Sequence, residues 1–363
     1  MEARQEWKLE MNNSKNGQTS LIDRKNVVLL GLGRAGKFHI QSIKAIPGLR
    51  LKCVVDVDEA RAKRLAAELE CDYATDADGP LGQEDVDAVI VASPTHEHFG
   101  QIQNALKAGK PVFTEKPLGS DLNEIDTCFD LAKRYDLPLF VGFNRRFDPS
   151  FASLAAGVQA GQVGVLQMLR VTSRDSPLPT MEYISTSHGI FHDCIVHDFD
   201  MLRFITSCNP VEIFAVGSSF LEGIGKLNDL DNVLVTLKYD DGMIASIDVN
   251  RFAAYGYDQR IEVFGSEGML QAENRATVST VLSNKEGLHR PTIEHSFPSR
   301  YKEAYQRELV EFLECINEGK PAPVTHEEVR MSFILSELGE QSHRENIPLK
   351  VSDHPGLAGS GSV

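Results

Sequence analysis

The sequence predicts an α/β domain built on a parallel sheet, followed by an α+β domain with a mainly antiparallel, open sheet. Three observations predict this class. Between Asn26 and Phe147, short runs rich in valine and isoleucine alternate with amphipathic stretches. After Asp148, apolar runs follow one another at short spacing, separated by turn sequences. The chain has 363 residues, 42% of them hydrophobic, which is enough for two domains with separate cores.

The first domain, 26–147, consists of repeated strand–helix pairs. Near-continuous Val/Ile strands that alternate with helices are typical of a parallel sheet covered on both faces. The predicted strands are NVVLLGLG from Asn26, LKCVVDV at 51–57, DAVIVASP at 87–94, PVFTEKP at 111–117 and PLFVGF at 138–143. The predicted helices are 35–46, 58–70, 95–109 and 121–136.

The second domain, 148–350, is predicted from strands in quick succession. One pair is joined by the hairpin turn Asp240-Asp241-Gly242. The predicted strand segments are 164–175, 211–220, 232–252, 259–274 and 277–284, with one helix near 192–206 and two closing helices near 301–317 and 327–339. We expect residues 1–25 to be a mostly disordered lead-in and 351–363 a flexible tail.

Composition excludes several classes of function. The net charge of −15 argues against nucleic acid or an anionic membrane surface as a partner. No apolar stretch approaches the roughly 18 residues that span a bilayer, and the polar first residues lack the apolar centre of a signal peptide. Six cysteines without a C-x-x-C pair or a disulfide-like spacing indicate reduced thiols and a cytoplasmic protein.

The segment VLLGLGRAGKFH, from Val28 to His39, carries a G-x-G-x-x-G motif between a predicted strand and a predicted helix. Gly31 would permit the turn, Gly33 would let the backbone approach a pyrophosphate, and Gly36 would let helix and strand pack closely. The pyrophosphate would lie at the helix N-terminus. Such a motif alone is also compatible with a simple tight turn, but its strand–loop–helix–strand–acid setting predicts a dinucleotide-binding Rossmann domain.

Asp56 predicts which dinucleotide binds. It lies 20 residues after Gly36 and ends the next strand, LKCVVD. A carboxylate there accepts hydrogen bonds from both ribose hydroxyls of the adenosine and repels a 2′-phosphate, so NAD is favoured over NADP. Arg34, inside the loop, is a cation that would tolerate a phosphate.

Two segments carry candidate catalytic residues. EKPLG places Lys116 at the carboxyl end of a parallel strand, where such sheets bind ligands, although a solvated lysine before a turn is the simpler interpretation. HDCIVHDFD places Asp193 and His197 four residues apart, on one face of a helix, with Asp200 near that face. A carboxylate beside an imidazole orients it and raises its basicity, as a general base requires, whereas a helix cap with surface ion pairs is the alternative.

Other histidines raise the question of a metal. His96 and His98 alternate, and His188 and His192 are spaced four residues apart near His197. We expect no metal, because His96 and His98 lack further ligands at suitable spacing and hydride transfer requires none. Thr95 would instead cap the helix that follows it. Tyr255 or Tyr257 would reach a ligand or simply pack.

Together, these segments resemble the glucose–fructose oxidoreductase / inositol dehydrogenase family over nearly all of Asn26 to Leu349, and its inositol 2-dehydrogenase branch most closely. The matching segments, in chain order, are GLGRAGKFH, ASPTHEHF, EKPL, GFNRRFDPSF, VTSRD, GIFHDCIVHDFDMLRFI and YGYDQRIEVFGSEGML. Two positions depart from the family pattern: His188 replaces a usual glycine and Ser176 a usual proline.

The resemblance implies a two-domain, NAD-dependent oxidoreductase that pairs subunits through the open sheet, as a dimer or tetramer. It implies Lys116, Asp193 and His197 as the catalytic group. The expected cofactor-binding residues are Gly31, Gly33, Arg34, Ala35, Gly36, Asp56, Ser93, Pro94, Thr95, His98, Glu115, Lys116 and Arg145. Residues expected at the substrate are Lys116, Asn144, Ser173, Arg174, Asp175, Asp193, His197 and Tyr257.

The expected reaction is oxidation of a ring hydroxyl of myo-inositol or a close cyclic polyol. His197, oriented by Asp193, would take the hydroxyl proton while Lys116 stabilises the oxygen, although the sequence also allows Lys116 to be the base. A sugar dehydrogenase or reductase acting on a pyranose is an alternative. A non-catalytic NAD-binding regulator is a further one, which the presence of all three catalytic candidates disfavours.

Overall fold

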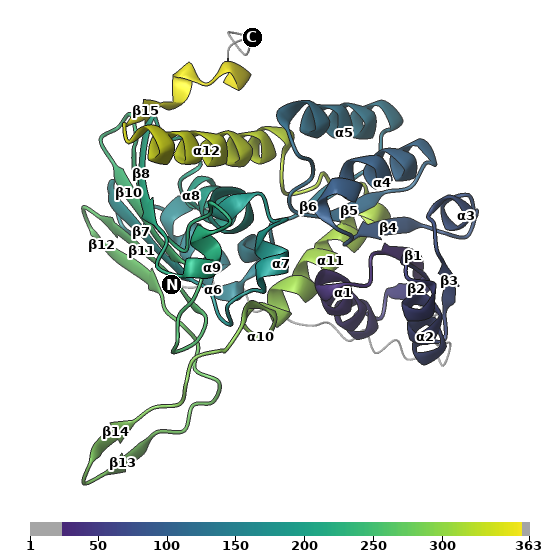
Figure 1. Cartoon of the computed structure of the whole chain (residues 1–363), viewed down its shortest axis with the longest axis horizontal. Coiled ribbons are helices and arrows are strands. Elements are labelled where there is room, and N and C mark those ends of the chain that lie inside the picture. Colours follow the sequence, from purple (N-terminus) through teal and green to yellow (C-terminus); the bar gives the residue numbers. More distant parts are fainter. Residues whose placement is uncertain (1–23, 358–363) are drawn as a thin grey trace, which may run out of the picture.

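The computed structural model describes residues 24–357, which form two domains side by side (Figure 1). The expected lead-in at 1–25 falls almost wholly outside the described residues, as does the end of the expected tail. The N-terminal domain is a six-stranded parallel sheet in the order β3-β2-β1-β4-β5-β6. This is the doubly wound parallel sheet that the alternating pattern predicts.

The elements of the N-terminal domain follow the predicted rhythm. Its strands are β1 Lys25–Leu30, β2 Leu49–Val55, β3 Asp72–Ala74, β4 Ala88–Val91, β5 Val112–Glu115 and β6 Leu139–Gly142. Its helices are α1 Arg34–Ala45, α2 Glu59–Leu69, α3 Asp78–Leu81, α4 Thr95–Lys107 and α5 Leu122–Tyr135, and a 3-10 turn, η1 Asn144–Phe147, leads out of the domain.

The C-terminal domain is a seven-stranded sheet in the order β12-β11-β7-β10-β9-β8-β15, in which β7 and β10 are parallel and the other neighbours antiparallel. Its strands are β7 Leu166–Arg174, β8 Glu212–Ser218, β9 Asn232–Lys238, β10 Ile244–Asn250, β11 Asp258–Gly265, β12 Gly268–Ala272 and β15 Leu349–Lys350. Its longer helices are α6 Pro149–Gln159, α8 Val196–Thr206, α11 Lys302–Glu318 and α12 His326–Glu345. The short ones are α7 Met181–Ile184, the π-helical turn η2 Phe191–Ile195, α9 Glu222–Gly225, α10 Phe297–Arg300, η3 Val351–Asp353 and η4 Pro355–Leu357.

Several features differ from the sequence-based expectation, among them short helical turns such as α3, α7, α9 and α10. Strand β3 and helix α6 were not predicted, although α6 has a clear start: Pro149 is its first residue, and the Asp148 carboxylate accepts from the Ser150 and Phe151 amides. The strand expected at 277–284 is not in the main sheet. Its end forms β13 Leu282–Asn284, which pairs with β14 Gly287–His289 in an arm that projects from the molecule (Figure 1).

The expected flexible tail is also shorter than predicted. Residues 351–357 form η3 and η4 and pack against α12, where Arg330 donates a 2.7 Å hydrogen bond to the carbonyl oxygen of Gly356. His354 Nε2 lies 3.0 Å from a carboxylate oxygen of Glu337. The C-terminal domain therefore continues to at least Leu357.

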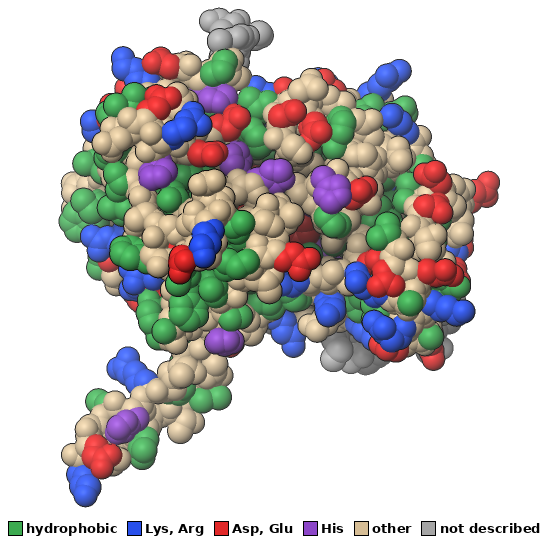
Figure 2. Space-filling view, in the orientation of Figure 1, with side chains coloured by type: hydrophobic (Ala, Val, Ile, Leu, Met, Phe, Trp, Pro, Cys, Tyr) green, Lys and Arg blue, Asp and Glu red, His purple; other side chains and the backbone are tan. Residues whose placement is uncertain are grey.

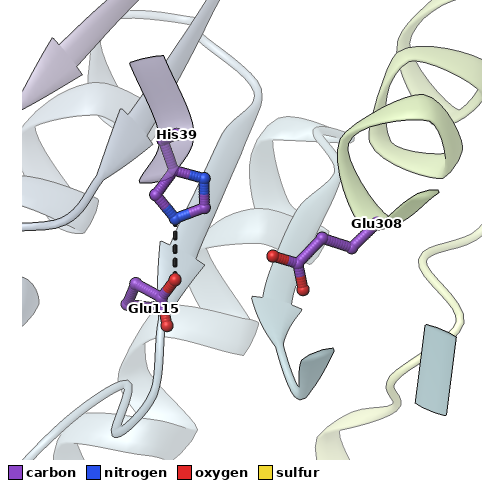
Figure 3. A group of neighbouring side chains, drawn as sticks. All are labelled: His39, Glu115 and Glu308. Atoms are coloured by element: carbon purple, nitrogen blue, oxygen red, sulfur yellow. Dashed lines mark hydrogen bonds and ion pairs between the residues drawn. The ribbon is translucent and has the colours of Figure 1, made fainter. Parts of the chain in front are cut away.

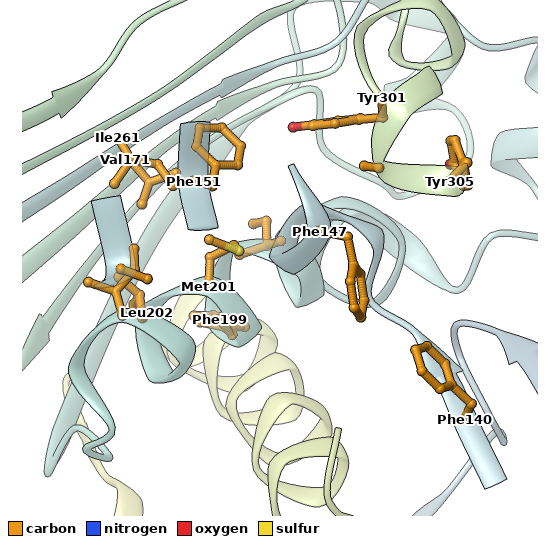
Figure 4. Packing of buried hydrophobic residues seen from close by; sticks show 14 of the residues in the cluster. Phe140, Phe147, Phe151, Val171, Phe199, Met201, Leu202, Ile261, Tyr301 and Tyr305 are labelled. Carbon is orange, nitrogen blue, oxygen red and sulfur yellow. The ribbon is translucent and has the colours of Figure 1, made fainter. Parts of the chain in front are cut away.

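Helix α11 crosses to the other domain. Its Phe312 packs against Phe113 of β5 and Phe140 of β6, with ring centroids 5.9 Å apart in both pairs. The helix therefore shares one face of the parallel sheet with α1, while α4 and α5 cover the opposite face. Phe140 and Phe147 continue this packing toward Phe151 and Tyr301, so one apolar core runs through both domains (Figure 4).

Helices that could cross a membrane, being both long and apolar, do not occur in the part of the chain from 24 to 357.

Candidate active site

The glycine loop lies between β1 and α1. Gly31 has φ +91°, and a Cβ there would come within 2.5 Å of the Ser93 backbone. A Cβ on Gly36 would collide with the Gly31 carbonyl oxygen, whereas one on Gly33 would meet no atom of residues 24–357 within 4 Å. Gly31 and Gly36 are therefore required by the turn and by the close helix–strand packing. Gly33, the N-cap of α1, borders open space at the helix N-terminus, which fits the pyrophosphate of a dinucleotide.

Asp56 follows β2 directly and lies beside this loop. Its carboxylate accepts hydrogen bonds of 2.9 Å from the amides of Leu32 and Asp58, so its orientation is fixed. Arg61 Nη1 lies 3.3 Å from the same carboxylate, a cation that the sequence analysis did not identify. The acid expected at the adenosine ribose thus has a guanidinium neighbour.

Lys116 and Asp193 meet between the two domains. Lys116 directly follows β5, and its Nζ donates a 2.6 Å hydrogen bond to the main-chain carbonyl of Asp193. The same Nζ lies 3.5 Å from Asp193 Oδ1. The two side chains are 15% and 10% exposed, so the pair is largely shielded from bulk solvent. A lysine at the carboxyl end of a parallel strand, paired across domains, is the arrangement expected of a ligand-binding residue.

Two further residues hold the Asp193 carboxylate, and neither was predicted. The Tyr183 hydroxyl donates a 2.7 Å hydrogen bond to Oδ1, and Arg251 Nη1 donates a 3.0 Å bond to Oδ2. Arg251 is fully buried and also pairs with Asp229 at 2.8 Å. Burial alone would raise the pKa of Asp193, but Lys116, Arg251 and Tyr183 together lower it below its usual value.

His197 is not the partner of Asp193. Among residues 24–357, the Asp193 carboxylate contacts Tyr183, Arg251, Lys116 and the Cys194 thiol, and the predicted acid–histidine pair is not formed. The reason is local: Asp193 lies in the π-helical turn η2 and His197 in α8, so the i, i+4 spacing of an α-helix does not hold between them. Burial, then the charges of Lys116 and Arg145, lowers the pKa of His197 well below its usual range, which favours the neutral imidazole.

Most of the other residues expected at the substrate surround this group. Asn144 and Arg145 lie buried in η1, and Arg145 forms a buried ion pair with Asp198 and a 3.4 Å hydrogen bond to Ser173 Oγ. Burial raises the pKa of Asp175 to about 6, with the Asp193 charge adding to the effect. Tyr257 is buried beside Tyr301, at a ring-centroid distance of 5.8 Å. Arg145 therefore acts within a salt bridge and is not a free cation.

Several expected residues lie elsewhere or have other partners. Arg174 pairs with Asp248 and contacts Tyr255 on the open face of the β-sheet, whereas its neighbour Ser173 faces the core side. Asp200 pairs with Arg146, away from His197. Thr95 is the first residue of α4, and the N-cap is Pro94, so Thr95 does not cap the helix.

His98 likewise does not face an open site. Its two ring nitrogens lie 2.7 Å from the carbonyl oxygen of Pro117 and 2.9 Å from that of Ser93. The side chain is 2% exposed. His98 therefore links the chain beyond β4 to the segment after Lys116, and it would influence a cofactor only through these loops.

A cavity of about 430 Å³ opens beside the Lys116 loop. Its wall includes Thr95, Pro117, His188 and His192, together with residues of α12. Figure 2 shows histidine side chains gathered around this hollow between the domains. Burial, with a further contribution from His188, lowers the pKa of His192 to about 4.

Comparison with known proteins identifies the family. The profile of the oxidoreductase family with an NAD-binding Rossmann fold matches residues 25–143, and the profile of the GFO/IDH/MocA C-terminal domain matches residues 151–271. The chain belongs to the GFO/IDH/MocA oxidoreductase family. Its first domain is accordingly an NAD-binding Rossmann domain, as the glycine loop predicts.

Relatives within the GFO/IDH/MocA family extend over most of the chain. A myo-inositol 2-dehydrogenase of Thermotoga maritima is 38% identical over 327 residues, 90% of this chain and 98% of that protein. An inositol 2-dehydrogenase of Rhizobium meliloti is 39% identical over 292 residues, 80% of this chain and 88% of the relative. The structure of a scyllo-inositol dehydrogenase from Lactobacillus casei with NAD(H) and scyllo-inositol is similar with a TM-score of 0.85, at 28% identity over 91% of this chain and all of that one.

The two departures from the GFO/IDH/MocA pattern lie close to the site. His188 has φ +62°, the left-handed region that glycine enters without a Cβ penalty, so this backbone conformation would suit the glycine expected there. Its side chain is exposed and lines the cavity. Ser176 is buried, and its amide donates a 2.7 Å hydrogen bond to Asp175 Oδ1.

A buried acidic cluster lies behind Lys116. His39 Nε2 is 2.7 Å from Glu115 Oε1, and the Glu308 carboxylate points toward this pair from α11 (Figure 3). Ligand atoms of the three side chains lie within 4.8 Å of one another, the one grouping among residues 24–357 with the spacing of a metal site. Glu115, expected at the cofactor, thus has His39 as its partner. Both Glu308 oxygens lack a hydrogen-bond partner among the described residues.

The surroundings of Glu308 favour its protonated, neutral form. Burial, then the charge of Glu115, raises its pKa well above the usual value. The groups around it are His39, Glu115 and Tyr305, none of which supplies a permanent positive charge. A proton on Glu308 removes the cost of burying a second carboxylate beside Glu115.

Replacing Glu308 with glutamine is expected to remove a pH-dependent loss of stability. The folded protein holds this proton more tightly than the unfolded chain, so the free energy of unfolding falls as pH rises from glutamate's ordinary range through the raised pKa, by about 1.4 kcal/mol per pH unit. The Tm difference between Glu308→Gln and the unmodified protein should therefore grow as the pH rises above the ordinary pKa of glutamate. Glu318→Gln, at the exposed end of the same helix, is the control. A pH-independent difference, or loss of a bound cation on substitution, would contradict this assignment.

Proposed function

We propose that this protein oxidises a ring hydroxyl of myo-inositol, or of a close cyclic polyol, to the ketone, with NAD as the hydride acceptor. The observation that carries the proposal is the meeting of Lys116 and Asp193 between the domains, beside His197 and next to a loop fitted to a dinucleotide. The similarity to inositol 2-dehydrogenases over most of the chain supports the choice of substrate.

The division of labour follows from charge. The Lys116 ammonium donates a hydrogen bond to the substrate hydroxyl oxygen and stabilises negative charge that develops on it. His197 is neutral and accepts the hydroxyl proton. A weak base is sufficient for this step, because the hydroxyl becomes strongly acidic as its carbon loses a hydride. Asp193 holds the Lys116 ammonium in place through its main-chain and side-chain oxygens.

The cofactor would be held at three points. The amides of the first turn of α1, next to Gly33, face the pyrophosphate, and Asp56 accepts the hydroxyls of the adenosine ribose. The loop after β4, which includes Ser93, lies next to Gly31 on the side of Lys116. NAD supplies the hydride acceptor, and the alcohol loses one hydride and one proton to become the ketone.

The substrate assignment predicts a strong preference for polyhydroxylated rings. Asp175, Asn144 and His197 offer polar groups that an apolar alcohol would leave unpaired, and such sites discriminate by up to ~10⁴-fold. We expect turnover of myo-inositol with NAD and negligible turnover of cyclohexanol, a matched ring with a single hydroxyl. The measurement is kcat/KM across inositol isomers, glucose, xylose and short alcohols. Activity on cyclohexanol or an acyclic alcohol, with none on an inositol or a pyranose, would refute the proposal.

We further infer a homo-oligomer formed through the open face of the C-terminal sheet. Met168 pairs in register with Ile244 on one side and Phe264 on the other, and Phe264 pairs with Met269. All four side chains are between 41% and 48% exposed, and together they form a continuous apolar strip across four strands. A second copy of the chain would cover this strip, which sedimentation velocity would detect.

Six free cysteines support a cytoplasmic location.

A further inference from the structure

Arg34 links the cofactor loop to the second domain. It is the first residue of α1, directly after Gly33, and its guanidinium carbon lies 4.6 Å from the centroid of the Tyr183 ring. On another side it lies 4.9 Å from the centroid of the Phe297 ring. A guanidinium between two aromatic rings is attracted to both ring faces and restricts their movement. The side chain that follows the predicted pyrophosphate site therefore fixes two aromatic residues of the other domain.

Tyr183 continues this link to the catalytic group. Its ring contacts Arg34, and its hydroxyl donates a 2.7 Å hydrogen bond to Asp193 Oδ1. The residue lies in the short helix α7, whose Thr180 cap accepts a 3.3 Å bond from the Tyr183 amide. Burial, then the charge of Asp193, raises the pKa of the phenol, so it remains a hydrogen-bond donor at any pH at which the enzyme works.

Tyr183 holds one of the two carboxylate oxygens of Asp193 in place. Arg251 donates to Oδ2 at 3.0 Å. Tyr183 donates to Oδ1 at 2.7 Å, which is closer than Lys116 Nζ, at 3.5 Å from the same oxygen. Loss of the Tyr183 hydroxyl would leave the carboxylate free to rotate about its contact with Arg251. Lys116, which hydrogen-bonds the main chain of the same residue, would then lose a fixed negative neighbour.

We propose that Tyr183 is a positioning residue that couples the cofactor loop to the catalytic centre, because Arg34 fixes its ring and its hydroxyl fixes the Asp193 carboxylate. The proposal rests on the proposed function, in which Asp193 holds Lys116. A ligand at the N-terminus of α1 would thus act on Asp193 through two side chains, Arg34 and Tyr183. No residue in this path other than Asp193 needs to touch the polyol.

Two substitutions of Tyr183 separate the ring from the hydroxyl. Tyr183→Phe keeps the ring against Arg34 and removes only the hydrogen bond to Asp193. We expect an unchanged NADH dissociation constant, a kcat reduced by about 10-fold, and an acid limb of the pH–kcat/KM profile displaced to higher pH, because a charge-stabilising bond to Asp193 is lost. Tyr183→Leu should add a weaker NADH affinity to the same changes.

Phe297→Leu is the matched control. It removes the other ring from the Arg34 guanidinium but leaves the Tyr183 hydroxyl bonded to Asp193, so it should weaken NADH binding and leave the acid limb in place. A Tyr183→Phe enzyme with the original kcat and pH profile would overturn the proposal. So would a Phe297→Leu enzyme whose acid limb moves as far as that of Tyr183→Phe.

A second measurement does not depend on turnover. In cofactor-free protein, Arg34→Met and Tyr183→Leu should lower the Tm non-additively when combined, because they remove the same contact. Additive changes would contradict the coupling between loop and tyrosine. One outcome is that the protein turns over no polyol and still shows non-additive Tm changes for Arg34→Met and Tyr183→Leu. The proposed function would then fail, but the contact between Arg34 and Tyr183 would stand.

Discussion

Replacing Lys116 with methionine is expected to lower kcat by roughly 10²–10⁴-fold while NADH binding is retained. Methionine keeps the length of the side chain but removes the ammonium that would stabilise the substrate oxygen. It also removes the 2.6 Å bond to the Asp193 carbonyl. The Asp193 carboxylate keeps Tyr183 and Arg251 as partners, so the fold around it should remain intact.

The measurement is steady-state turnover together with a fluorescence titration of NADH. Lys107→Met, on the exposed surface of α4, is the control for the loss of a lysine. His197→Ala should likewise lower kcat strongly while NADH binding is retained. Near-normal turnover by Lys116→Met would show that the ammonium does not act on the substrate and would remove the central residue from the proposed mechanism.

Replacing Asp56 with serine is expected to weaken NAD and admit NADP. Two hydrogen bonds from ribose hydroxyls to a carboxylate would be lost, at about 1.5–3 kcal/mol each, and the charge that repels a 2′-phosphate disappears with them. Arg61, 3.3 Å from this carboxylate, would be released to pair with the phosphate. The ratio of kcat/KM for the two cofactors should therefore shift strongly toward NADP.

Arg61 makes this second experiment selective. Asp56→Ser combined with Arg61→Leu should weaken NAD as the single substitution does, yet lose the gain in NADP activity. Thermal melts would confirm that the loop still folds, since Asp56 also accepts from the Leu32 and Asp58 amides. A preference of the unmodified enzyme for NADP would show that Asp56 does not select the cofactor.

The fold class and the glycine loop could be predicted because their signals are local. A motif of glycines between a strand and a helix needs only a few neighbouring residues, and φ +91° at Gly31 is the conformation that this motif requires. Lys116 could be predicted for the same reason, since it ends a strand whose apolar run is evident. Strand β3 was missed because three residues at the sheet edge leave almost no pattern.

The partners of the candidate catalytic residues could not be predicted from local spacing. Arg251 is 58 residues from Asp193, and Glu308 is far along the chain from Glu115, so only the packed structure brings them together. The prediction that Asp193 orients His197 was wrong because it assumed an uninterrupted α-helix through residues 191–197. The π-helical turn changes the phase of the side chains, and the sequence FHDCI gives no simple signal for it.

Helix α11 has a consequence for how the protein is made. The parallel sheet needs Phe312 over Phe113 and Phe140, yet residues 302–318 follow nearly the whole second domain in the chain. During synthesis on the ribosome, the surface around Phe113 and Phe140 in the cofactor domain therefore remains uncovered until most of the protein has been made. A gene fragment that ends at the apparent domain boundary near residue 147 would encode a dinucleotide fold with an exposed apolar face, a product prone to aggregation.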